Sequence, residues 1–184
     1  MPRRASVTEE RETHIHPTAI VDADSEIGDG VQIGPWVIIG PQVSIGAGTR
    51  IGPRVLIERD TILGTDCTIA NGAVLGTDAQ DMKYQGEPAT LEIGDRTVVR
   101  EFATLNRGTA ASGKTVVGSD CLLMAYTHVA HDCELGNRVI LSNAVNMGGH
   151  VRVEDWAIVG GLTPIHQFVR IGAHAFVGGG SRVS

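Results

Sequence analysis

Aromatic residues are scarce in this 184-residue chain: they make up 4% of it, whereas glycine occurs 24 times. So few large rings and so much glycine favour a narrow interior into which bulky side chains do not fit. The length is that of a single domain.

Basic residues and long apolar runs are also in short supply. Lysine and arginine number 15 against 21 aspartates and glutamates, and the resulting net charge of −6 argues against a broad nucleic-acid-binding surface. No apolar run approaches the roughly 18 residues of a membrane span. The opening segment, MPRRASVTEERET, lacks the apolar core of a signal peptide. We expect residues 1–13 to be a flexible, solvated tail and residues 14–184 to be one folded domain.

What the chain does contain is a six-residue repeat. An aliphatic residue or methionine stands at every sixth position from Ile15 to Leu75, again from Ile93 to Leu105, and again from Val117 to Val183. The residue two positions earlier is small or β-branched in nearly every hexad, and the residue just after is often glycine. Such a register does not arise by chance over most of a chain, so the repeat is the main evidence for the fold.

Each hexad has the pattern of a short strand followed by a bend. Alternation within the hexad is typical of a β-strand, and glycine is expected to supply the tight backbone at the bend. Three hexads then close one triangular coil, and successive coils bury one another's faces. The sequence therefore predicts an all-β solenoid, a triangular parallel β-helix with three hexads per coil. The repeat itself does not set the handedness, since general crossover rules favour the right hand.

Cysteine is rare, and each of the three cysteines, Cys67, Cys121 and Cys133, stands at the small-residue position of its hexad. Cys67 and Cys121 fall in one column of the helix but two coils apart, ~9–10 Å at strand spacing, which is too far for a disulfide. We therefore expect buried free thiols, which fit a reducing cytoplasm.

Two segments, residues 77–90 and residues 106–116, interrupt the repeat without shifting its register. Each is expected to be a loop that leaves a finished wall of the solenoid, and long loops in compact domains are usually functional or disordered. The first carries Gln80, Asp81 and Lys83, which make it richer in polar groups than a mere spacer needs to be.

Counting the hexads in threes places both loops and most of the histidines in one column. The hexads THVAHD, VNMGGH and TPIHQF, residues 127–132, 145–150 and 163–168, follow one another there. Successive coils are about 4.8 Å apart. Four of the seven histidines therefore gather within a few coils of one another: His128, His131, His150 and His166. We expect these residues to form one site.

The motifs of this site resemble a known family. The runs AQDMKYQGEP, THVAHDCELGNR, NMGGHV and PIHQF are similar to those of the UDP-N-acetylglucosamine O-acyltransferases, hexapeptide-repeat enzymes that begin lipid A biosynthesis. The resemblance extends from about His14 to Ser184. It implies a left-handed parallel β-helix with two external loops. Family members continue into a helical C-terminal region, which we expect to be absent here because the sequence stops within the hexad of Val183.

The resemblance also implies an activity and its partners. A 3-hydroxyacyl group would pass from acyl carrier protein to the 3-hydroxyl of UDP-N-acetylglucosamine, with no cofactor beyond the phosphopantetheine that carries the acyl group. The enzyme would be a cytoplasmic homotrimer without a metal, and its site would lie between neighbouring prisms because a flat wall makes a poor pocket.

Roles follow from the same resemblance. His131 is expected to be the general base that takes the proton of the attacking sugar hydroxyl, which suits an imidazole with a pKa near neutrality. Asp132 would orient this base, and the N–H of Gly149 would face the developing oxyanion. The residues expected to contact the substrate are Gln80, Asp81, Lys83, His128, His150, His166 and Gln167, and Lys83 among them is suited to a phosphate. The residues expected near the far end of the acyl groove are Phe176 and Gly179.

Other functions stay open at this point. The N-acyltransferase of the same pathway shares the solenoid and a histidine base, and a variant acceptor could carry a 3-amino group. Trimeric β-helices of the carbonic anhydrase type place histidines of adjacent chains on zinc. A solenoid can also serve as a scaffold without catalysis.

Overall fold

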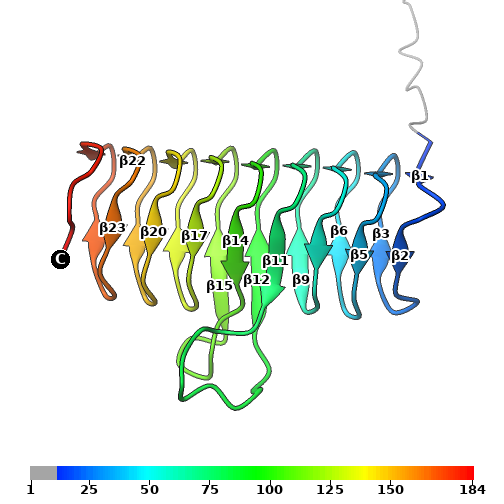
Figure 1. Ribbon diagram of the computed structural model, residues 1–184, viewed down its shortest axis with the longest axis horizontal. Helices are drawn as coiled ribbons and strands as arrows, with labels where there is room; N and C mark the ends of the chain where they lie inside the picture. The colour runs from blue at the N-terminus through cyan, green and yellow to red at the C-terminus, as the bar shows by residue number, and fades with distance from the viewer. Residues whose placement is uncertain (1–11) are drawn as a thin grey trace, which may run out of the picture.

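Residues 12–184 are described by the computed structural model, and they wind into a triangular prism of short parallel strands (Figure 1). Twenty-five strands follow one another along this part of the chain, most of them only two residues long. No helix in the described segment is long and apolar enough to cross a membrane. The expected tail, residues 1–13, lies outside the described residues except for its last two positions.

Three parallel sheets, one on each face of the prism, take every third strand. Sheet A contains β1 (His14–Ile15), β4 (Gln32–Ile33), β7 (Arg50–Ile51), β10 (Thr68–Ile69), β13 (Val98–Val99), β16 (Leu122–Leu123), β19 (Ile140–Leu141), β22 (Ile158–Val159) and β25 (Phe176–Val177). Sheet B contains β2 (Ile20–Val21), β5 (Ile38–Ile39), β8 (Leu56–Ile57), β11 (Val74–Thr77), β14 (Thr104–Asn106), β17 (His128–Val129), β20 (Asn146–Met147) and β23 (Pro164–Ile165). Sheet C contains β3 (Glu26–Ile27), β6 (Ser44–Ile45), β9 (Thr61–Leu63), β12 (Thr90–Ile93), β15 (Lys114–Val117), β18 (Glu134–Leu135), β21 (Arg152–Val153) and β24 (Arg170–Ile171).

Each strand pairs with the strand three places later, so equivalent residues of successive coils lie side by side. On sheet B, Leu75 pairs with Leu105, Leu105 with Val129, and Val129 with Met147. All four side chains are 0% exposed and fill the interior of the prism. The column predicted from the repeat is confirmed, and the chain is the expected left-handed parallel β-helix.

At the corners of the prism, residues other than the repeat glycines adopt the backbone conformation that reverses the chain. At most corners the third residue of the turn has a positive φ without being glycine; examples are Trp36 at 55°, Asp132 at 58° and His150 at 61°. Among the glycines that directly follow an aliphatic repeat residue, only Gly76 has a positive φ. The prediction that these glycines supply the bend is therefore wrong. The backbone hydrogen bonds between coils hold the strained residue in place.

The repeat glycines are needed for the close approach of one coil to the next. A Cβ added to Gly40 would lie 1.7 Å from the carbonyl oxygen of Glu58, and one added to Gly118 would lie 2.4 Å from that of Gly136. Both oxygens belong to the backbone of the following coil, which close packing keeps from moving aside. Glycine therefore recurs where coils touch.

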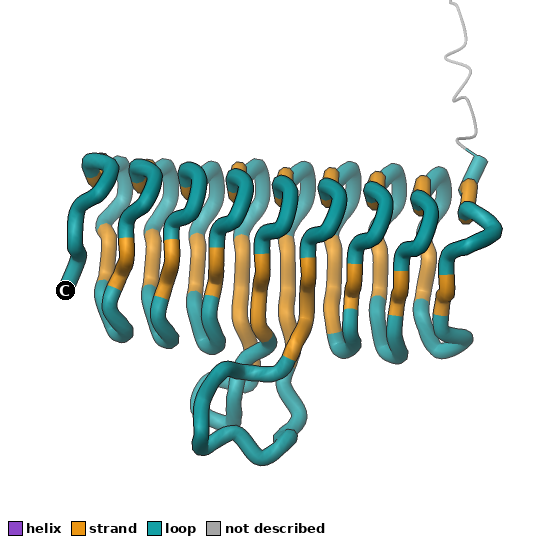
Figure 2. Tube along the Cα trace, viewed as in Figure 1, coloured by secondary structure: helices purple, strands orange, loops and turns teal. Residues whose placement is uncertain are grey.

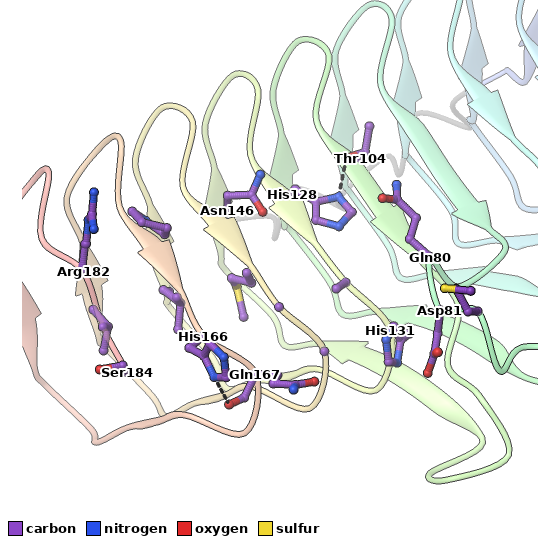
Figure 3. Close-up of a pocket in the computed structure, with 18 of the residues that line it drawn as sticks. Gln80, Asp81, Thr104, His128, His131, Asn146, His166, Gln167, Arg182 and Ser184 are labelled. Carbon is purple, nitrogen blue, oxygen red and sulfur yellow. Dashed lines mark hydrogen bonds between the residues drawn. The ribbon is translucent and has the colours of Figure 1, made fainter.

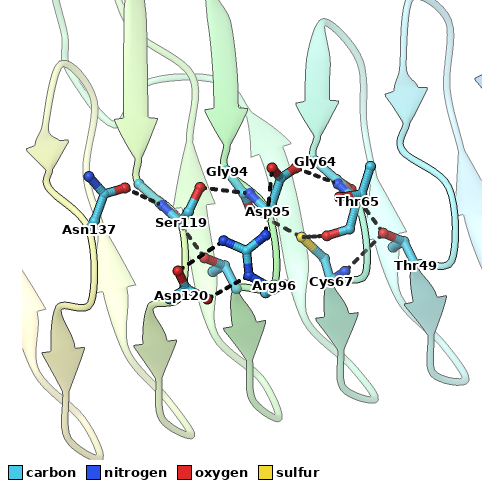
Figure 4. A network of polar contacts seen from close by, with 12 residues as sticks. Thr49, Gly64, Thr65, Cys67, Gly94, Asp95, Arg96, Ser119, Asp120 and Asn137 are labelled. Carbon is cyan, nitrogen blue, oxygen red and sulfur yellow. Dashed lines mark hydrogen bonds and ion pairs between the residues drawn. The ribbon is translucent and has the colours of Figure 1, made fainter.

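Polar side chains complete the turns at the corner between sheets C and A (Figure 4). The side-chain oxygen of each accepts a hydrogen bond from the backbone N–H of the equivalent residue one coil earlier. The N–H of Thr65 donates to Asp95 at 2.8 Å, that of Asp95 to Ser119 at 3.0 Å, and that of Ser119 to Asn137 at 2.9 Å. A ladder of short polar side chains thus ties the coils together along the outside.

The three cysteines are buried and free, as predicted. Cys67 and Cys121 lie two coils apart in one column, and the hydroxyl of Thr97, in the coil between them, accepts the N–H of Cys121 at 3.1 Å. Burial raises the pKa of all three thiols, that of Cys133 to about 12. At neutral pH they are therefore protonated and poorly reactive.

Both interruptions of the repeat leave the prism at the same edge, between sheets B and C (Figure 2). Loop 78–89 joins β11 to β12, and loop 107–113 joins β14 to β15. The second loop is shorter than predicted because residues 114–117 extend β15 and pair with residues 90–93. The two loops lie beside each other because their parent strands are neighbours in each sheet.

Gly118→Ala is expected to lower the free energy of unfolding by about 1–3 kcal/mol, because the added methyl group overlaps the backbone of the next coil. Gly172→Ala is the matched control: it stands at the same place in its hexad, and the nearest atom to its Cβ is a Glu154 carboxylate oxygen at 4.0 Å. Urea unfolding followed by circular dichroism measures both. Equal losses in the two variants would show that coil contact is not what selects glycine.

Candidate active site

A groove of about 1230 Å³ runs along the outer face of sheet B, from loop 78–89 toward residue 184 (Figure 3). It is open along its length rather than enclosed, and more than half of the residues that line it are polar or charged. The polar and charged residues that line it are Gln80, Asp81, Lys83, Thr104, Tyr126, His128, His131, Asn146, His166, Gln167, Arg182 and Ser184.

The stacking of coils brings the candidate residues together at one corner. The N–H of His150 donates to the carbonyl of His131 at 3.1 Å, and the N–H of Phe168 donates to that of Gly149 at 3.1 Å. Consequently His131, Gly149 and Gln167 occupy equivalent places in three successive turns, and all three line the groove. Residues far apart in sequence are neighbours because each coil repeats the path of the one before.

His131 and Asp132 form a buried hydrogen-bonded pair. Nδ1 of His131 lies 2.8 Å from Oδ2 of Asp132, whose side chain is 0% exposed. Asp132 also accepts the N–H of Thr109 at 2.9 Å, the hydroxyl of Thr109 at 2.7 Å and the hydroxyl of Ser112. Its own N–H donates to the hydroxyl of Thr115 at 2.9 Å.

These contacts decide the charge of Asp132. Burial opposes ionisation, but the hydrogen bonds from Ser112, Thr109 and His131 outweigh it and hold the pKa of the carboxyl well below its usual range. An ionised carboxylate only accepts hydrogen bonds, so the proton of the neutral His131 ring must sit on Nδ1. Nε2 is then left with its lone pair for the groove, which is the state that a general base requires.

Gly149 lies directly against the His131 ring. A Cβ at this position would be 2.5 Å from Cε1 and 2.7 Å from Nε2 of His131, so no larger residue fits beside the ring in this position. Within residues 12–184 no acceptor lies in hydrogen-bonding position for the N–H of Gly149. Gly149, which lines the groove and touches the ring, therefore keeps a free backbone donor that a negatively charged oxygen could use.

His150 and Phe168 pack behind this pair. The His150 ring meets the His131 ring edge-on at 5.2 Å and stacks on Phe168 at 4.6 Å between centroids. Its Nε2 lies 3.8 Å from Oδ2 of Asp132. His150 is the one predicted histidine of the cluster that is not among the residues lining the groove.

His131, Asp132 and His150 also satisfy the spacing of a metal site, with one donor atom from each within 4.8 Å of the others. Asp132, however, already accepts four hydrogen bonds, and Nδ1 of His131 is one of the donors. A carboxylate has about four lone-pair positions. A metal ion would have to displace this hydrogen-bonding network, so the arrangement favours a proton-transfer pair.

His128, in the same coil as this pair, and His166, two coils further on, both line the groove. Nδ1 of His128 lies 2.7 Å from the hydroxyl of Thr104. Burial, and secondarily the charge of His131, lowers the pKa of His128 and so favours its neutral form. His166 is exposed, and its Nδ1 lies 3.2 Å from the carbonyl of Gln167. Both rings are thus available to a molecule lying in the groove.

Loop 78–89 supplies Gln80, Asp81 and Lys83 to the groove, as the sequence suggested. The loop is anchored by Arg107, which is only 3% exposed and donates to the carbonyl of Gly76, to the carboxylate of Asp78 and, at 3.3 Å, to the hydroxyl of Tyr84. Arg107 was not predicted from the sequence, nor were the two Asp132 donors, Thr109 and Ser112. Their only signal was the presence of polar residues in the second interruption.

Two predicted residues lie away from the groove of their own chain. Phe176 is on β25 of sheet A, where its side chain is 74% exposed, and Gly179 follows it at the next corner. Neither is among the residues that line the groove on sheet B.

Comparison with known proteins agrees with this architecture. The family described as Bacterial transferase hexapeptide (six repeats) matches residues 12–47, 42–77 and 114–149. These matches together cover more than half of the chain. The segment between them holds both loops.

Individual relatives match most of the chain. The acyl-[acyl-carrier-protein]--UDP-N-acetylglucosamine O-acyltransferase of Pseudomonas putida is 48% identical over 170 residues, which are 92% of this chain and 66% of the relative. The solved UDP-N-acetylglucosamine acyltransferase of Bacteroides fragilis superposes with a TM-score of 0.92 at 42% identity, over 93% of this chain and 67% of that one. The Francisella novicida enzyme of that name gives 0.91 and 37%, over 92% and 62%. The chain thus spans just under two thirds of the length of the curated relatives it matches.

The free energy of unfolding is expected to fall more steeply in acid for the parent chain than for Asp132→Asn. A carboxyl whose folded pKa is depressed stabilises the fold fully above its unfolded pKa, about 3.9, and loses this contribution as the pH falls through the folded pKa. The difference between the two proteins should therefore be constant above about pH 6 and shrink below about pH 4. Urea unfolding at stepped pH measures it; a difference unchanged into acid would contradict the low pKa.

Proposed function

Because the chain belongs to the UDP-N-acetylglucosamine O-acyltransferase family of hexapeptide-repeat proteins, we propose that it transfers a 3-hydroxyacyl group to the 3-hydroxyl of UDP-N-acetylglucosamine. The donor would be a thioester on acyl carrier protein, and the reaction would be the first step of lipid A biosynthesis. The observation that carries this proposal is that Asp132 holds Nδ1 of His131 and leaves its Nε2 free, in a ring that lies against Gly149 in the groove.

The mechanism follows from these two groups. Nε2 of His131 takes the proton from the sugar hydroxyl as its oxygen attacks the thioester carbonyl, and Asp132 stabilises the imidazolium that forms. The carbonyl oxygen gains negative charge, which the N–H of Gly149 stabilises by a hydrogen bond. When the tetrahedral intermediate collapses, the C–S bond breaks and the thiolate takes the proton back from His131. No covalent enzyme intermediate is needed, because the sugar hydroxyl is the nucleophile.

The rest of the groove would bind the sugar nucleotide. Lys83 supplies a cation for a phosphate, and Asp81, beside it in the loop, supplies an acceptor for a sugar hydroxyl. Gln80 of the same loop supplies a further donor and acceptor, and His128, His166 and Gln167 line the same space from the prism wall. His150 stays a predicted substrate contact, although in this chain its ring lies against Phe168 and the catalytic pair.

A second copy of the chain would supply the missing wall of the groove, in a homotrimer. The outer face of sheet A supports this, because apolar side chains pair across it in one unbroken row: Val98, Leu122, Ile140, Ile158 and Phe176. If this face covers sheet B of the neighbouring chain, Phe176 and Gly179 can reach the acyl path from there. Phe176 and Gly179 would then line the groove of the neighbouring chain, which explains why they do not line the groove of their own.

The buried free thiols support a reducing compartment, and we place the enzyme in the cytoplasm. No cofactor is needed in this scheme apart from the phosphopantetheine of the carrier protein.

Product analysis tests the proposed function. The protein is incubated with 3-hydroxyacyl-[acyl carrier protein] and either UDP-N-acetylglucosamine or its 3-amino analogue, and the acylated sugar nucleotide is identified by mass spectrometry. We expect the ester from the hydroxyl acceptor. Formation of the amide alone would move the assignment to an N-acyltransferase, and transfer to neither acceptor would contradict the proposal.

His131→Ala is expected to lower kcat by roughly 10²–10⁴, the contribution of a positioned general base. His16→Ala is the matched control, since His16 lies in the first coil, where its Nδ1 lies 2.9 Å from the hydroxyl of Thr18, and is not among the residues that line the groove. Steady-state assays should show the loss in the first variant only. Wild-type turnover by His131→Ala would rule out this mechanism.

A further inference from the structure

We propose that loop 107–113 is a cradle for Asp132, in which Thr109 and Ser112 act as positioning residues for His131. The inference rests on the proposed function, since it concerns the same proton transfer. The second interruption of the repeat thereby has a role in the site, although it contributes no side chain to the lining of the groove.

The geometry is that of a complete anion site. Oδ1 of Asp132 accepts the N–H of Thr109 at 2.9 Å and the hydroxyl of Ser112, and Oδ2 accepts the hydroxyl of Thr109 at 2.7 Å and Nδ1 of His131 at 2.8 Å. Three of the four donors come from the loop. The side chain of Asp132 is 0% exposed, so within the described residues these donors take the place of water.

Such a cradle has a consequence for His131. A buried carboxylate without donors would take up a proton or move, and its partner ring would lose a defined orientation. With each oxygen held by one donor or more from the loop, the carboxylate has a single position, and the Nδ1–H of His131 has a fixed acceptor. The loop therefore sets the direction of Nε2 without touching the substrate itself.

Other titratable groups also face Asp132. Nε2 of His150 lies 3.8 Å away, and the buried thiol of Cys133 follows directly in sequence. Glu87 approaches from the other loop, where its carboxylate accepts the N–H of Ala110 at 3.2 Å. None of these three supplies a hydrogen bond to Asp132, so the loop hydroxyls are the groups whose removal changes its environment most directly.

Thr109→Val and Ser112→Ala, singly and together, test the cradle. Each removes a hydrogen bond to a charged acceptor, and such a bond changes an equilibrium constant by about a factor of ten or more. We expect the double variant to lose on the order of tenfold or more in kcat, with little change in KM for the sugar nucleotide. Because the anion is less stabilised, the coupled pair binds its proton more tightly, so the acid limb of the kcat–pH profile should move to higher pH.

Two controls make the result specific. Thr109→Ser keeps the hydroxyl and should keep both kcat and the pH profile. Ser119→Ala removes a hydroxyl that accepts the N–H of Asp95 at the corner between sheets C and A, and it should change neither. An acid limb that stays in place in the double variant, or that moves equally in Ser119→Ala, would overturn the positioning role. Full turnover by His131→Ala would instead overturn the proposed function.

A separate observation concerns Arg107. We infer that this buried guanidinium positions loop 78–89 for the sugar nucleotide, because it joins the loop residues Asp78 and Tyr84 to the carbonyl of Gly76 at the end of β11. The hydroxyl of Tyr84 also donates to Asp78 at 3.1 Å, so the three side chains form one closed group. The loop residues that line the groove lie between the two anchor points, Asp78 and Tyr84.

Tyr84→Phe and Arg107→Lys are expected to raise KM for the sugar nucleotide several-fold, with kcat and the pH profile unchanged, and to speed amide hydrogen exchange in loop 78–89. Lys83→Ala is the comparison: it should raise KM without a change in exchange, since Lys83 makes no hydrogen bond through its side chain in the described residues. Wild-type KM in both anchor variants, or a raised KM without faster exchange, would contradict the anchoring role.

Discussion

The parallel backbone hydrogen bonds between coils set the dimension on which the whole molecule depends. They hold each coil one strand spacing, about 4.8 Å, from the next. At that distance a Cβ on Gly40 would overlap the carbonyl of Glu58, so glycine recurs where coils touch. The same bonds keep Trp36 and its equivalents at positive φ, and they align aliphatic side chains such as Leu105 and Val129 into one continuous interior.

The same spacing builds the candidate site. Residues 18 apart in the regular repeat come into contact, so His131 lies against Gly149, and His150 lies against Phe168. A strict repeat would leave Asp132 at a corner without donors from any loop. The insertion of residues 107–113 one coil earlier surrounds it with hydroxyl and N–H groups. The geometry of the candidate site thus comes from a regular scaffold that is broken at two neighbouring points.

The period of the repeat was sufficient to predict the solenoid and the shared column of the loops and the histidines. The pairing of His131 with Asp132 was expected from the family resemblance instead. The period was insufficient where the chain leaves the repeat. The partners of Arg107 depend on how loop 78–89 folds back, and the burial of Asp132 depends on loop 107–113; neither loop has a periodic pattern. The bend was attributed to glycine because a repeat pattern does not separate a strained φ from a close contact.

Nitrogen-15 NMR of the histidine rings is the most direct test of the central claim, that an ionised Asp132 fixes His131 as a base. Above the pH at which the ring titrates, Nδ1 of His131 should carry the proton and Nε2 should show the resonance of an unprotonated nitrogen. Asp132→Asn should lose this preference, because an amide can also donate to Nδ1. A neutral His131 ring that carries its proton on Nε2 in the parent chain would contradict the account, since no lone pair would then face the groove.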